Sequence, residues 1–487
     1  MKKVESTQRR DFIKKSMVTL GGLSVVPANA LFGGERIWDE SASRFRQKSF
    51  VPSEKVNLAC VGVGHQGGGI MNAFHDTGLA NIVALCDVDM GNEHTLNAIE
   101  KFPDVPRFKD FRKMFDKMAN KIDAVSIGTP DFSHFPIAML AMSLGKHVYV
   151  EKPLARTFNE IELMMAAAEK YNVVTQMGNQ GHSGANYFQF KAWKEAGIIK
   201  DVTAMSAHMN NWRRWHPFNP LMTSLPEKEE MPETMNWDVW LNTAQHHDYN
   251  KDYHHGQWRC WYDFGMGALG DWGAHIMDTA HRFLELGLPY EVEPVLLEGH
   301  NSFFFPFSST LVFKFPERKN MPAMNITWYD GLKNLPQVPE GYHSSTELDP
   351  DVPPPTKGSS EPVKLRPGKI IYSKDLTFKG ASHGSTLSII GGEKAQDMAS
   401  SLHEVPISPS NHYENFLLAC KGEEEARSSF DISGPLSQVF TLGVAAQRLS
   451  TRLQFDRETK QFTNSKYGNM MLTGAPPRKG WEEFYKL

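Results

Sequence analysis

The feature that constrains the fold most is one glycine-rich stretch at residues 56–69, with the sequence VNLACVGVGHQGGG. An apolar run, Val56–Val61, leads into this stretch, and a helix-like segment, Gly69–Thr77, follows it. In a βαβ unit that binds a dinucleotide, the glycines allow a tight turn, a close approach of backbone N–H groups to the pyrophosphate, and close packing of helix on strand. The helix N-terminus then faces the phosphate charge. The sequence therefore predicts nucleotide binding by Gly62, Gly64, His65, Gln66 and Gly67.

A second apolar run, Ile82–Cys86, ends in Asp87 and predicts which nucleotide binds. Asp87 lies about twenty residues beyond Gly67, where an acidic side chain can hydrogen-bond the ribose hydroxyls. It would repel a 2′-phosphate, and the next residues, Val88 and Asp89, supply no positive charge. We therefore expect NAD rather than NADP. The alternative is an ordinary tight turn between a strand and a helix.

The first thirty residues resemble an export signal. Arg9-Arg10 is followed by Asp11-Phe12-Ile13-Lys14, which resembles the twin-arginine motif, although Gln8 stands where serine is more usual. A weakly apolar run, Met17–Val26, leads to the small-residue cleavage site Ala28-Asn29-Ala30. We expect residues 1–30 to be a twin-arginine signal peptide, residues 31–53 to be a polar arm, and the protein to be periplasmic after export in folded form. The alternative is a basic tail.

The charge of the chain disfavours polyanionic partners. The leader holds six basic and two acidic residues, and the whole chain has a net charge of −4, so the remainder carries −8. This surplus of negative charge argues against nucleic acid and anionic membranes as binding partners. No apolar run reaches the length of a membrane span, and no cysteine follows the leader to carry a lipid anchor. The four cysteines show no CxxC spacing, and Cys60 and Cys86 fall in expected buried strands.

Strands and helices alternate between residues 54 and 178, which predicts an α/β fold with a doubly wound parallel sheet. Thr157 and Glu160 have the spacing of a capping box at the start of a helix that runs to Tyr171. The other expected elements of this domain are strands at Ala124–Ile127, His147–Val150 and Val173–Met177 and a helix at Phe135–Leu144.

The alternation is lost in residues 179–487, which predicts a second domain with a different, antiparallel or mixed, sheet. A segment rich in proline, glycine and serine at 330–368 is expected to be a long surface loop. We expect strands at Val202–Met209, Phe303–Phe315, Met324–Tyr329 and within 369–391, a helix after a glycine-rich turn within Gly265–Leu286, and the last helices at His412–Cys420 and Ile432–Thr451.

Three features together resemble the glucose–fructose oxidoreductase / inositol dehydrogenase (Gfo/Idh/MocA) family. They are the 56–87 unit, the run GTPDFSH at 128–134 with Glu151-Lys152-Pro153 after it, and the run GDWGAHIMD at 270–278. The resemblance implies an N-terminal Rossmann domain and a C-terminal α/β domain whose sheet serves as substrate platform or oligomer interface. It also implies hydride transfer between NAD(P) and a sugar, polyol or similar hydroxy compound, and a homodimer or homotetramer.

The resemblance implies a catalytic set of Lys152, Asp271 and His275. The residues also make chemical sense alone, because Asp271 and His275 are four apart and share one helix face, where a histidine beside a carboxylate can accept a hydroxyl proton. Lys152 ends a strand at the carboxyl edge of the sheet, where ligands bind. The sequence leaves open whether Lys152 or His275 is the base.

Further residues are expected around this set. Thr129, Pro130, His134 and Glu151 are assigned to the nicotinamide side of the cofactor site. Asn179, Gln180 and His182 follow the last strand of the first domain and are substrate candidates, together with Asp278, which either contacts substrate or only belongs to its helix.

The stretch from residue 211 to residue 261 is rich in tryptophan and histidine. Indole rings stack well on sugar rings, and we expect one or two of these tryptophans in the site and the rest in the core or an interface. The pairs His246-His247 and His254-His255 do not have the spacing of a metal motif, so no metal is expected. The tryptophans in question are Trp212, Trp215, Trp237, Trp240, Trp258 and Trp261.

Export creates a supply problem, because free NAD is not expected outside the cytoplasm. The leading hypothesis is therefore a periplasmic oxidoreductase that transfers hydride between a carbohydrate hydroxyl and a tightly bound NAD. The alternative is a redox-neutral NAD-dependent enzyme that cleaves or epimerises a glycoside through a keto intermediate. A hypothesis of another class is a nucleotide-binding protein without catalysis.

Overall fold

The computed structural model describes residues 55–210, 219–254, 256–319, 321–339, 342, 366–391, 398 and 405–487. The expected leader at 1–30, the arm at 31–53 and most of the expected loop at 330–368 lie outside these residues, as do Trp212, Trp215 and His255. Residues 331–339 of that loop contain no helix or strand. Within the described part of the chain, no helix combines the length and apolar character needed to cross a bilayer.

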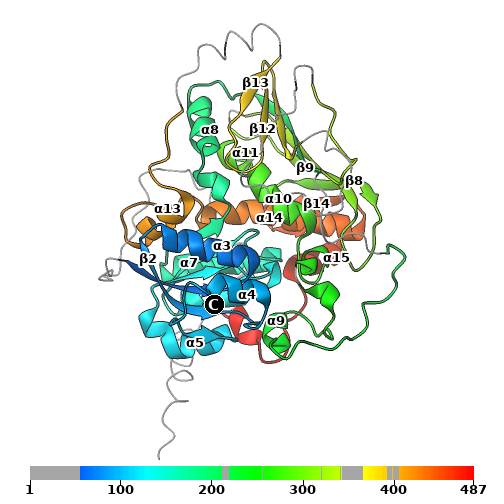
Figure 1. Ribbon diagram of the computed structural model, residues 1–487. Helices are drawn as coiled ribbons and strands as arrows, with labels where there is room; N and C mark the ends of the chain where they lie inside the picture. The colour runs from blue at the N-terminus through cyan, green and yellow to red at the C-terminus, as the bar shows by residue number, and fades with distance from the viewer. Residues whose placement is uncertain are drawn as a thin grey trace, which may run out of the picture.

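Six parallel strands form the N-terminal sheet in the order β3-β2-β1-β4-β5-β6. This domain is the blue and cyan lower part of Figure 1. The chain moves outward from β1 in one direction and from β4 in the other, so the carboxyl ends of β1 and β4 form the switch point at which open α/β sheets bind ligands. The strands are β1 (Val56–Val61), β2 (Ala80–Cys86), β3 (Arg107–Phe108), β4 (Ala124–Ile127), β5 (His147–Glu151) and β6 (Thr175–Gly178). The intervening helices are α3 (His65–Asp76), α4 (Glu93–Ile99), α5 (Phe111–Met118), η1 (Ala119–Lys121), η2 (Asp131–Ser133), α6 (His134–Ser143) and α7 (Phe158–Tyr171).

The predicted parallel sheet is thus confirmed, and the local sequence features expected in it are present in the structure. Thr157 and Glu160 form the expected capping box at the start of α7. Cys60 and Cys86 are buried, each 2% exposed, and act as small apolar residues between helices and sheet. The helix after the glycine turn begins at His65, four residues earlier than expected, because the turn needs only the residues up to Gly64.

A second sheet of nine strands has the order β13-β12-β11-β7-β10-β9-β8-β14-β15. It is mostly antiparallel, as expected, with one parallel pair between β7 and β10. Its strands are β7 (Val202–Met209), β8 (Glu291–Glu298), β9 (Ser308–Phe315), β10 (Met324–Asp330), β11 (Gly368–Ser373), β12 (Thr377–Ala381), β13 (Ser388–Ile390), β14 (Leu453–Asp456) and β15 (Gln461–Phe462).

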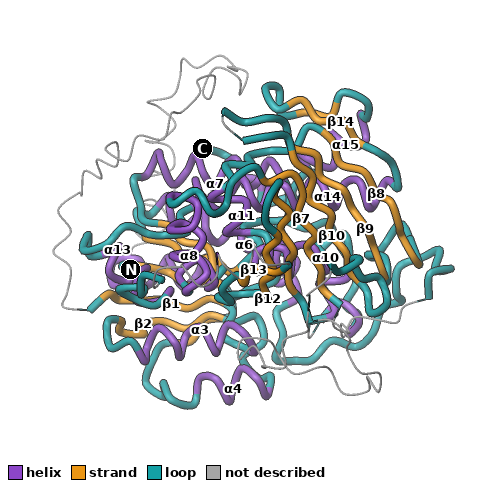
Figure 2. Tube along the Cα trace, turned by 90° about the horizontal axis from the view of Figure 1, so that it is seen from above, coloured by secondary structure: helices purple, strands orange, loops and turns teal. Residues whose placement is uncertain are grey.

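The helices of the second domain join it to the first. The long helix α14 packs against α7 of the parallel sheet and against α10, β8 and β9 of the second domain. In Figure 1 it lies between the two domains, and in the view of Figure 2 it overlaps the strands of the second sheet. The helices are η3 (Gln180–Ser183), α8 (Ala185–Glu195), α9 (Trp237–Leu241), η4 (Lys251–Tyr253), η5 (Gln257–Cys260), α10 (Gly267–Ile276), α11 (Asp278–Phe283), α13 (His412–Cys420), α14 (Phe430–Leu449), α15 (Lys466–Thr473) and η6 (Glu482–Tyr485).

Three sequence predictions in this domain were wrong. The segment 265–286 contains two helices, α10 and α11, that meet at Met277 rather than one helix. The strand expected from Phe303 begins only at Ser308, because Phe303–Phe307 belong to a buried aromatic turn. Helix 432–451 is not the last, since α15 and η6 follow it and return the chain to the first domain.

Candidate functional site

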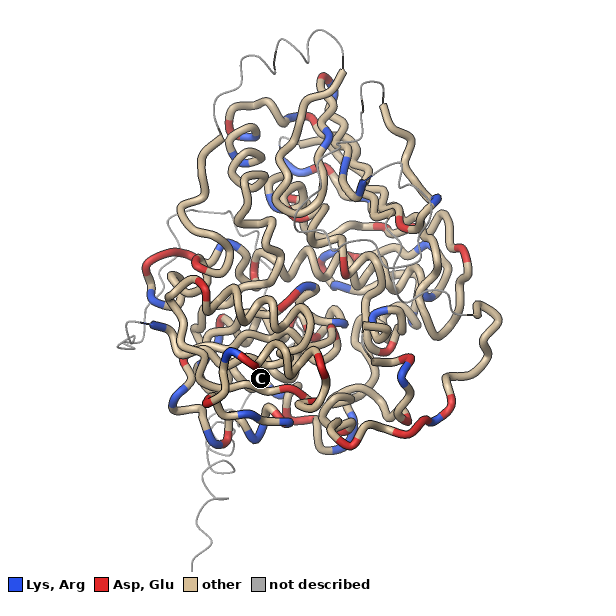
Figure 3. Tube along the Cα trace, in the orientation of Figure 1, with Lys and Arg blue, Asp and Glu red and all other residues tan. Residues whose placement is uncertain are grey.

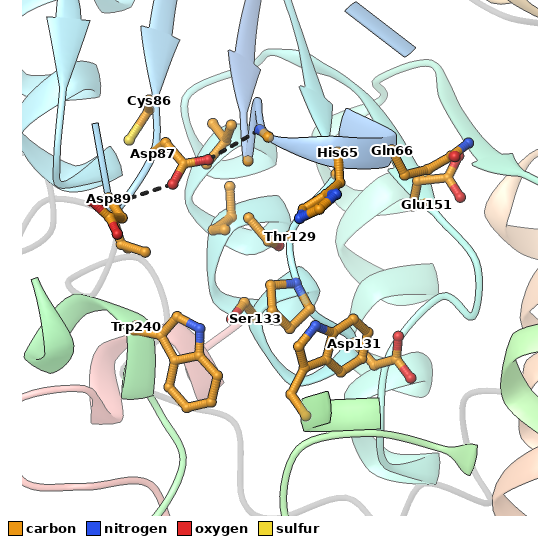
Figure 4. Close-up of a pocket in the computed structure, with 18 of the residues that line it drawn as sticks. His65, Gln66, Cys86, Asp87, Asp89, Thr129, Asp131, Ser133, Glu151 and Trp240 are labelled. Carbon is orange, nitrogen blue, oxygen red and sulfur yellow. Dashed lines mark hydrogen bonds between the residues drawn. The ribbon is translucent and has the colours of Figure 1, made fainter. Parts of the chain in front are cut away.

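A cavity of about 230 Å³ lies at the carboxyl ends of the parallel strands. Figure 4 shows Asp87 and Glu151 along its upper side and Trp240 along its lower side. The first domain contributes Gly62, Gly64, His65, Gln66, Asp87, Asp89, Thr129, Pro130, Asp131, Ser133, Glu151 and Lys152, among others. The second domain contributes Val239, Trp240, Asn242, His254, Gly256, Trp258 and Arg259.

The glycine turn has the close backbone packing that a dinucleotide site requires. Gly62 has a φ of +77°, which favours glycine. A Cβ on Gly67 would lie 1.8 Å from the carbonyl oxygen of Gly62, so no other residue fits there without moving the backbone. Gly67 itself does not line the cavity, and its role is to bring α3 against β1. The start of α3 therefore opens onto the cavity, where anions are stabilised by free N–H groups.

Asp87 connects this turn to the end of β2. Its Oδ2 accepts hydrogen bonds from the backbone N–H of Val63 at 2.9 Å and of Gly64 at 3.3 Å, and its Oδ1 accepts one from Asp89 N–H at 3.0 Å. Burial raises the pKa of Asp87, while these hydrogen bonds oppose the change. Each carboxylate oxygen has two lone pairs, so Oδ1 has capacity for a ribose hydroxyl.

Lys152 belongs to a chain of alternating charges at the opposite end of the cavity. Its Nζ donates to Asp271 Oδ1 at 2.8 Å and to the Asp271 carbonyl at 3.1 Å. Arg259 Nη1 lies 3.4 Å from the same Asp271 Oδ1 and 3.3 Å from Asp131 Oδ1, and Asp131 Oδ2 accepts from Met266 N–H at 3.1 Å. Lys152 thus contacts helix α10, and Arg259 and Asp131 extend this chain of charges. Asp271 itself does not line the cavity.

Glu151 lies beside Lys152 at the end of β5 and is 5% exposed. Its Oε1 accepts from Gln180 Nε2 at 3.1 Å. Burial raises the pKa of Glu151 to about 7, although the Lys152 charge opposes this change. Gln180, expected to contact substrate, therefore holds a carboxyl group of the cavity wall.

His134 occupies a different place from the other residues expected on the nicotinamide side. Thr129 and Pro130 line the cavity, whereas His134 is 1% exposed and does not. Its Nε2 lies 2.8 Å from the Thr129 carbonyl and its Nδ1 2.9 Å from the Pro153 carbonyl. The ring thereby ties the Thr129 turn to the Lys152-Pro153 segment and positions both.

His275 lies one turn beyond Asp271 on α10 and is 8% exposed. Its ring stacks on that of His383, with centroids 3.9 Å apart and planes 17° apart. The backbone N–H of His383 donates to the His275 carbonyl at 2.8 Å. The 382–384 turn therefore fixes the orientation of His275, a role that sequence analysis did not predict.

Three of the expected substrate residues form a buried cluster behind this wall. Asp278 Oδ2 accepts from Asn179 Nδ2 and is bonded to His182 Nδ1, both at 2.8 Å. Asn179 Oδ1 in turn accepts from Ser428 Oγ at 2.6 Å. All of these side chains are at most 5% exposed and none lines the cavity. In this structure the cluster joins β6, α11 and the start of α14, and its contact with substrate stays a prediction.

Two of the tryptophans, Trp240 and Trp258, line the cavity, as the sequence led us to expect of one or two. Trp237 stacks on Trp240 with centroids 4.3 Å apart, and Trp261 is fully buried. Among the described residues, no group of three or more histidine, cysteine or acidic side chains has a geometry suited to a metal ion.

The segment 234–243, which we call the strap, crosses the cavity and is bonded to the first domain on both sides. On the β2 side, Asn236 N–H donates to the Val88 carbonyl at 2.8 Å, and Met235 pairs with Asp89 in an antiparallel bridge. On the β4 side, Asn242 Nδ2 donates to Ser133 Oγ at 2.8 Å. Between these anchors, Val239 and Trp240 form part of the cavity wall.

The C-terminal segment holds the strap from outside. Arg478 donates from Nε to the Asn242 carbonyl at 2.9 Å, and its Nη1 and Nη2 bond the Asp238 carboxylate and carbonyl at 2.9 and 2.7 Å. Beyond it, Trp481 packs on Phe111, and Tyr485 Oη donates to Glu160 Oε1 at 2.6 Å. We call residues 478–485 the latch, because they tie the strap to the outer helices of the first domain.

Sequence reasoning missed Arg259, Asp131, the strap and the latch. Asp131 was part of the GTPDFSH run, and a search for a carboxylate partner of each cation would have singled it out. Arg259 lies in a stretch without a regular period, and nothing in the sequence places Arg478 beside residue 238. Only the folded chain brings these residues to the cavity.

Two family descriptions match the chain in succession. Residues 56–179 match the oxidoreductase family, NAD-binding Rossmann fold (GFO_IDH_MocA), and residues 201–295 match the C-terminal alpha/beta domain of the same family. Both matches agree with the two sheets described above.

Curated relatives are similar over part of their length. A Glycosyl hydrolase family 109 protein 2 of Shewanella sp. (strain ANA-3) is 30% identical over 169 residues, which cover 33% of this chain and 37% of that protein. Levoglucosan dehydrogenase of Pseudarthrobacter phenanthrenivorans is 26% identical over 234 residues, which cover 46% of this chain and 50% of that protein. The chain thus matches half or less of the length of these two relatives.

Solved structures share the fold. The WlbA dehydrogenase of Bordetella pertussis, in complex with NADH and UDP-GlcNAcA, superposes with a TM-score of 0.55 at 15% identity and covers 82% of this chain and 99% of its own. An aldose-aldose oxidoreductase of Caulobacter crescentus, complexed with glycerol, gives 0.52 at 14% identity and covers 82% and 100%. At these identities the likeness concerns the fold.

Proposed function

Residues 56–179 and 201–295 belong to the two domains of the Gfo/Idh/MocA oxidoreductase family, and from this premise we propose that the protein is an NAD-dependent oxidoreductase of carbohydrate hydroxyl groups. The observation that carries the proposal is that Lys152 lines the same cavity as the glycine turn and Asp87, and is held there by Asp271, which lies behind the cavity wall. That cavity brings a nucleotide site and a charged hydrogen-bond donor together, as a dehydrogenase requires.

The residues of the glycine turn fit NAD. The lack of room for a Cβ at Gly67 and the open N-terminus of α3 suit a pyrophosphate. Asp87 and Asp89 suit an unphosphorylated ribose and disfavour NADP. Thr129, Pro130 and Glu151 are the proposed wall of the nicotinamide end. When bound, NAD supplies the acceptor for the hydride that leaves the carbon bearing the hydroxyl.

The chain's own residues would then hold the substrate and move its proton. The Asp271 carboxylate at 2.8 Å favours the ammonium form of Lys152, which suits Lys152 to donate a hydrogen bond to the substrate oxygen. His275, on the next turn of the same helix, is our proposed base for the hydroxyl proton. Arg259 and His383 keep Asp271 and His275 in place.

The strap and the latch support a further part of the proposal, that the cofactor is held tightly between turnovers. The strap is bonded to the first domain at Val88 and at Ser133, on two sides of the cavity. A nucleotide seated beneath it could leave only after these contacts break. Retention would answer the supply problem of an exported enzyme.

A second candidate function is redox-neutral cleavage of a glycoside. The relatives named as glycosyl hydrolases favour it. Transient oxidation of a sugar hydroxyl would acidify the neighbouring C–H bond, so that the aglycone could be eliminated. Addition of water to the unsaturated sugar and return of the hydride to the keto group would then complete the cleavage with no net change in the cofactor. The same proposed residues would serve the oxidation step, so the two functions differ in products rather than in site.

The deciding experiment uses protein purified after export. Any nucleotide released on denaturation is identified, and the intact protein is then mixed with sugars and aryl glycosides while nicotinamide absorbance and product release are followed together. Reduced cofactor that accumulates in step with a keto-sugar supports the dehydrogenase. Aglycone released over many turnovers without net reduction supports the second candidate, and absence of bound or loadable nucleotide contradicts both.

Lys152→Met separates catalysis from nucleotide binding. We expect turnover to fall by roughly 100-fold or more, the usual effect of removing one hydrogen-bond donor to the reacting oxygen, with NAD affinity little changed. Lys170→Met, at an exposed position of α7, is the matched control. Turnover that is unchanged in Lys152→Met would contradict the role of Lys152, whereas unchanged NAD binding and unchanged biological activity, with no turnover in either protein, would favour a nucleotide-binding protein without catalysis.

We also propose periplasmic export through the twin-arginine route, on the support of Arg9-Arg10 and the cleavage site at residues 28–30. Arg9→Lys with Arg10→Lys keeps the charge of the leader. The double variant should remain in the cytoplasm of a bacterial host while the unaltered protein reaches the periplasm. Equal distribution of the two proteins in fractionation would contradict the proposal.

A further inference from the structure

The fixed charges at the Lys152 end of the cavity compensate one another. Lys152 is paired with Asp271 at 2.8 Å, and Arg259 lies between Asp131 at 3.3 Å and Asp271 at 3.4 Å. Asp131 and Asp271 are buried, with exposed fractions of 1% and 4%. Lys152 and Arg259 are the only lysine and arginine among the described residues that line this cavity. Both cations therefore already have carboxylate partners.

We propose that this pocket selects uncharged carbohydrates over sugar acids, and that Asp131 is the specificity-determining residue because it neutralises Arg259. The inference rests on the proposed function and names the substrate class of the same site. A sugar carboxylate entering the cavity would lose its hydration, and to form a close ion pair with Lys152 or Arg259 it would compete with the buried carboxylates that already balance these cations. Leaving a buried carboxylate unpaired in that exchange is costly.

Other groups of the cavity wall also favour a neutral sugar over a sugar acid. Glu151, whose pKa burial raises to about 7, adds negative charge as the pH rises above neutrality. Trp240 and Trp258 present aromatic surface to the cavity, which suits the apolar faces of a neutral sugar ring. The guanidinium of Arg259 lies 4.3 Å from the centroid of the Trp258 ring, so stacking as well as the ion pairs holds it in place.

Matched pairs of neutral and acidic sugars test the proposal on the NAD-loaded protein. Glucose is compared with glucuronate and galactose with galacturonate, by calorimetric binding and by turnover. We expect the neutral member of each pair to bind at least tenfold more tightly. Equal or tighter binding of the uronate would overturn this inference and leave the proposed function standing. Failure of every carbohydrate to bind or react would overturn the proposed function as well.

Asp131→Asn tests the assigned residue. The substitution removes one negative charge beside Arg259, so the ratio of uronate to neutral-sugar affinity should rise at least tenfold, and this gain should shrink in high salt. Asp76→Asn makes the same charge change at an exposed position, 64% exposed at its side chain, and should leave the ratio unaltered. An unchanged ratio in Asp131→Asn would overturn the role of Asp131. Should that variant not fold, the wild-type pairs still decide the proposal.

Discussion

At the scale of single residues, the Asp87 carboxylate fixes the glycine turn by hydrogen bonds and, in our proposal, also binds the ribose of NAD. One oxygen holds the N–H groups of Val63 and Gly64, and the other holds that of Asp89. In Asp87→Asn only one oxygen remains, so the amide NH₂ must face one of these donors. We expect NAD to bind roughly tenfold more weakly, because a lost hydrogen bond in a buried site costs about 1–3 kcal/mol, and we expect the preference for NAD over NADP to narrow.

Titration of the variant with NAD and NADP, followed by tryptophan fluorescence, checks this prediction. Trp240 and Trp258 line the cavity and provide the signal. Asp104→Asn, at an exposed position of the same domain, should leave both affinities unchanged. If Asp87→Asn bound both nucleotides as the wild type does, the assignment of Asp87 to the ribose would be wrong.

Asp330 in β10 gives a second prediction at this scale. It accepts hydrogen bonds from Ser309 N–H and Oγ and from Trp328 Nε1, at 2.7–2.9 Å. Burial nevertheless raises its pKa from 3.8 to about 6. The folded protein thus holds this proton more firmly than the unfolded chain does. The contribution to stability is therefore fully present below pH 3.8 and is lost as the pH rises through about 6.

Asp330→Asn removes that titration. The free energy of unfolding of the variant, relative to the wild type, should rise by roughly 1–2 kcal/mol between about pH 5 and about pH 7.5. Its absolute value will be lower, because the amide NH₂ faces a donor of Ser309 or Trp328. Urea unfolding at several pH values measures the difference, and a difference that does not depend on pH would contradict the assignment.

At the scale of elements, the latch controls how the strap covers the cavity. Arg478→Ala removes three hydrogen bonds to residues 238 and 242 but leaves Trp481 and Tyr485 to hold the C-terminus. We expect the rate of NAD release to rise roughly tenfold, since one charge-assisted bond lost in the closed state is worth about 1.5–3 kcal/mol. Thermal stability should fall only slightly.

Stopped-flow displacement of bound NAD measures this rate. Arg452→Ala is the control, because Arg452 is 57% exposed at its side chain and pairs with Glu293 on the second sheet, at 2.8 Å. A release rate that is the same in Arg478→Ala and in the wild type would mean that the strap does not limit exit of the cofactor.

The elements also show where sequence reasoning succeeds. Strands β1, β4 and β7 were predicted to the residue, because β1 and β4 are largely apolar segments with a clear stop and β7, VTAMSAHM, interleaves apolar with polar residues. Helix α7 was predicted from its capping box. Strand β8 was missed because its sequence, EVEPVLLE, mixes a proline and three glutamates with exposed apolar residues. Such a strand is specified by its neighbours β9 and β14 rather than by its own pattern.

The candidate site, like the strands, was predicted only in part from the sequence. Lys152 was singled out at a strand end and does line the cavity, whereas Asp271 and His275, singled out on one helix face, do not line it, and the catalytic roles of all three stay a prediction. Asp278, Asn179 and His182 were also singled out, yet the structure places them in a buried cluster away from the cavity. The sequence carries residue type and local spacing, and it does not tell which polar groups become bonded to one another instead of to a ligand.

At the scale of the whole molecule, the two domains form one structure through buried contacts rather than through surface charge. Acidic and basic residues are interspersed along the chain in both domains (Figure 3), whereas the joint between the domains contains buried polar groups. His412 of α13 bonds the Met177 carbonyl at the end of the first sheet, at 2.9 Å, and Ser183 Oγ at 2.8 Å. Such a joint depends on histidines that stay uncharged, and this makes the molecule sensitive to acid.

Five buried or largely buried histidines share this property. Burial lowers the pKa of His134, His147, His208 and His281 to about 4 and that of His412 to about 3. The unfolded chain takes up these protons near pH 6.5, so the stability they contribute is present above that pH and is lost as the pH falls toward about 4. Each histidine lowers the free energy of unfolding by roughly 2 kcal/mol when the pH falls from about 7 to about 5. Together these losses approach the whole free energy of unfolding of an ordinary domain, so we expect acid unfolding near about pH 5.

His147→Asn tests this expectation at one histidine. His147 Nδ1 accepts a hydrogen bond from Val174 N–H at 2.9 Å, which requires a neutral ring, and an asparagine oxygen can take over as acceptor without titrating. The midpoint of acid unfolding, followed by circular dichroism, should therefore move to lower pH in the variant. His246→Asn, at a side chain that is 73% exposed, should leave the midpoint in place. Equal midpoints in all three proteins would show that another group sets the acid limit.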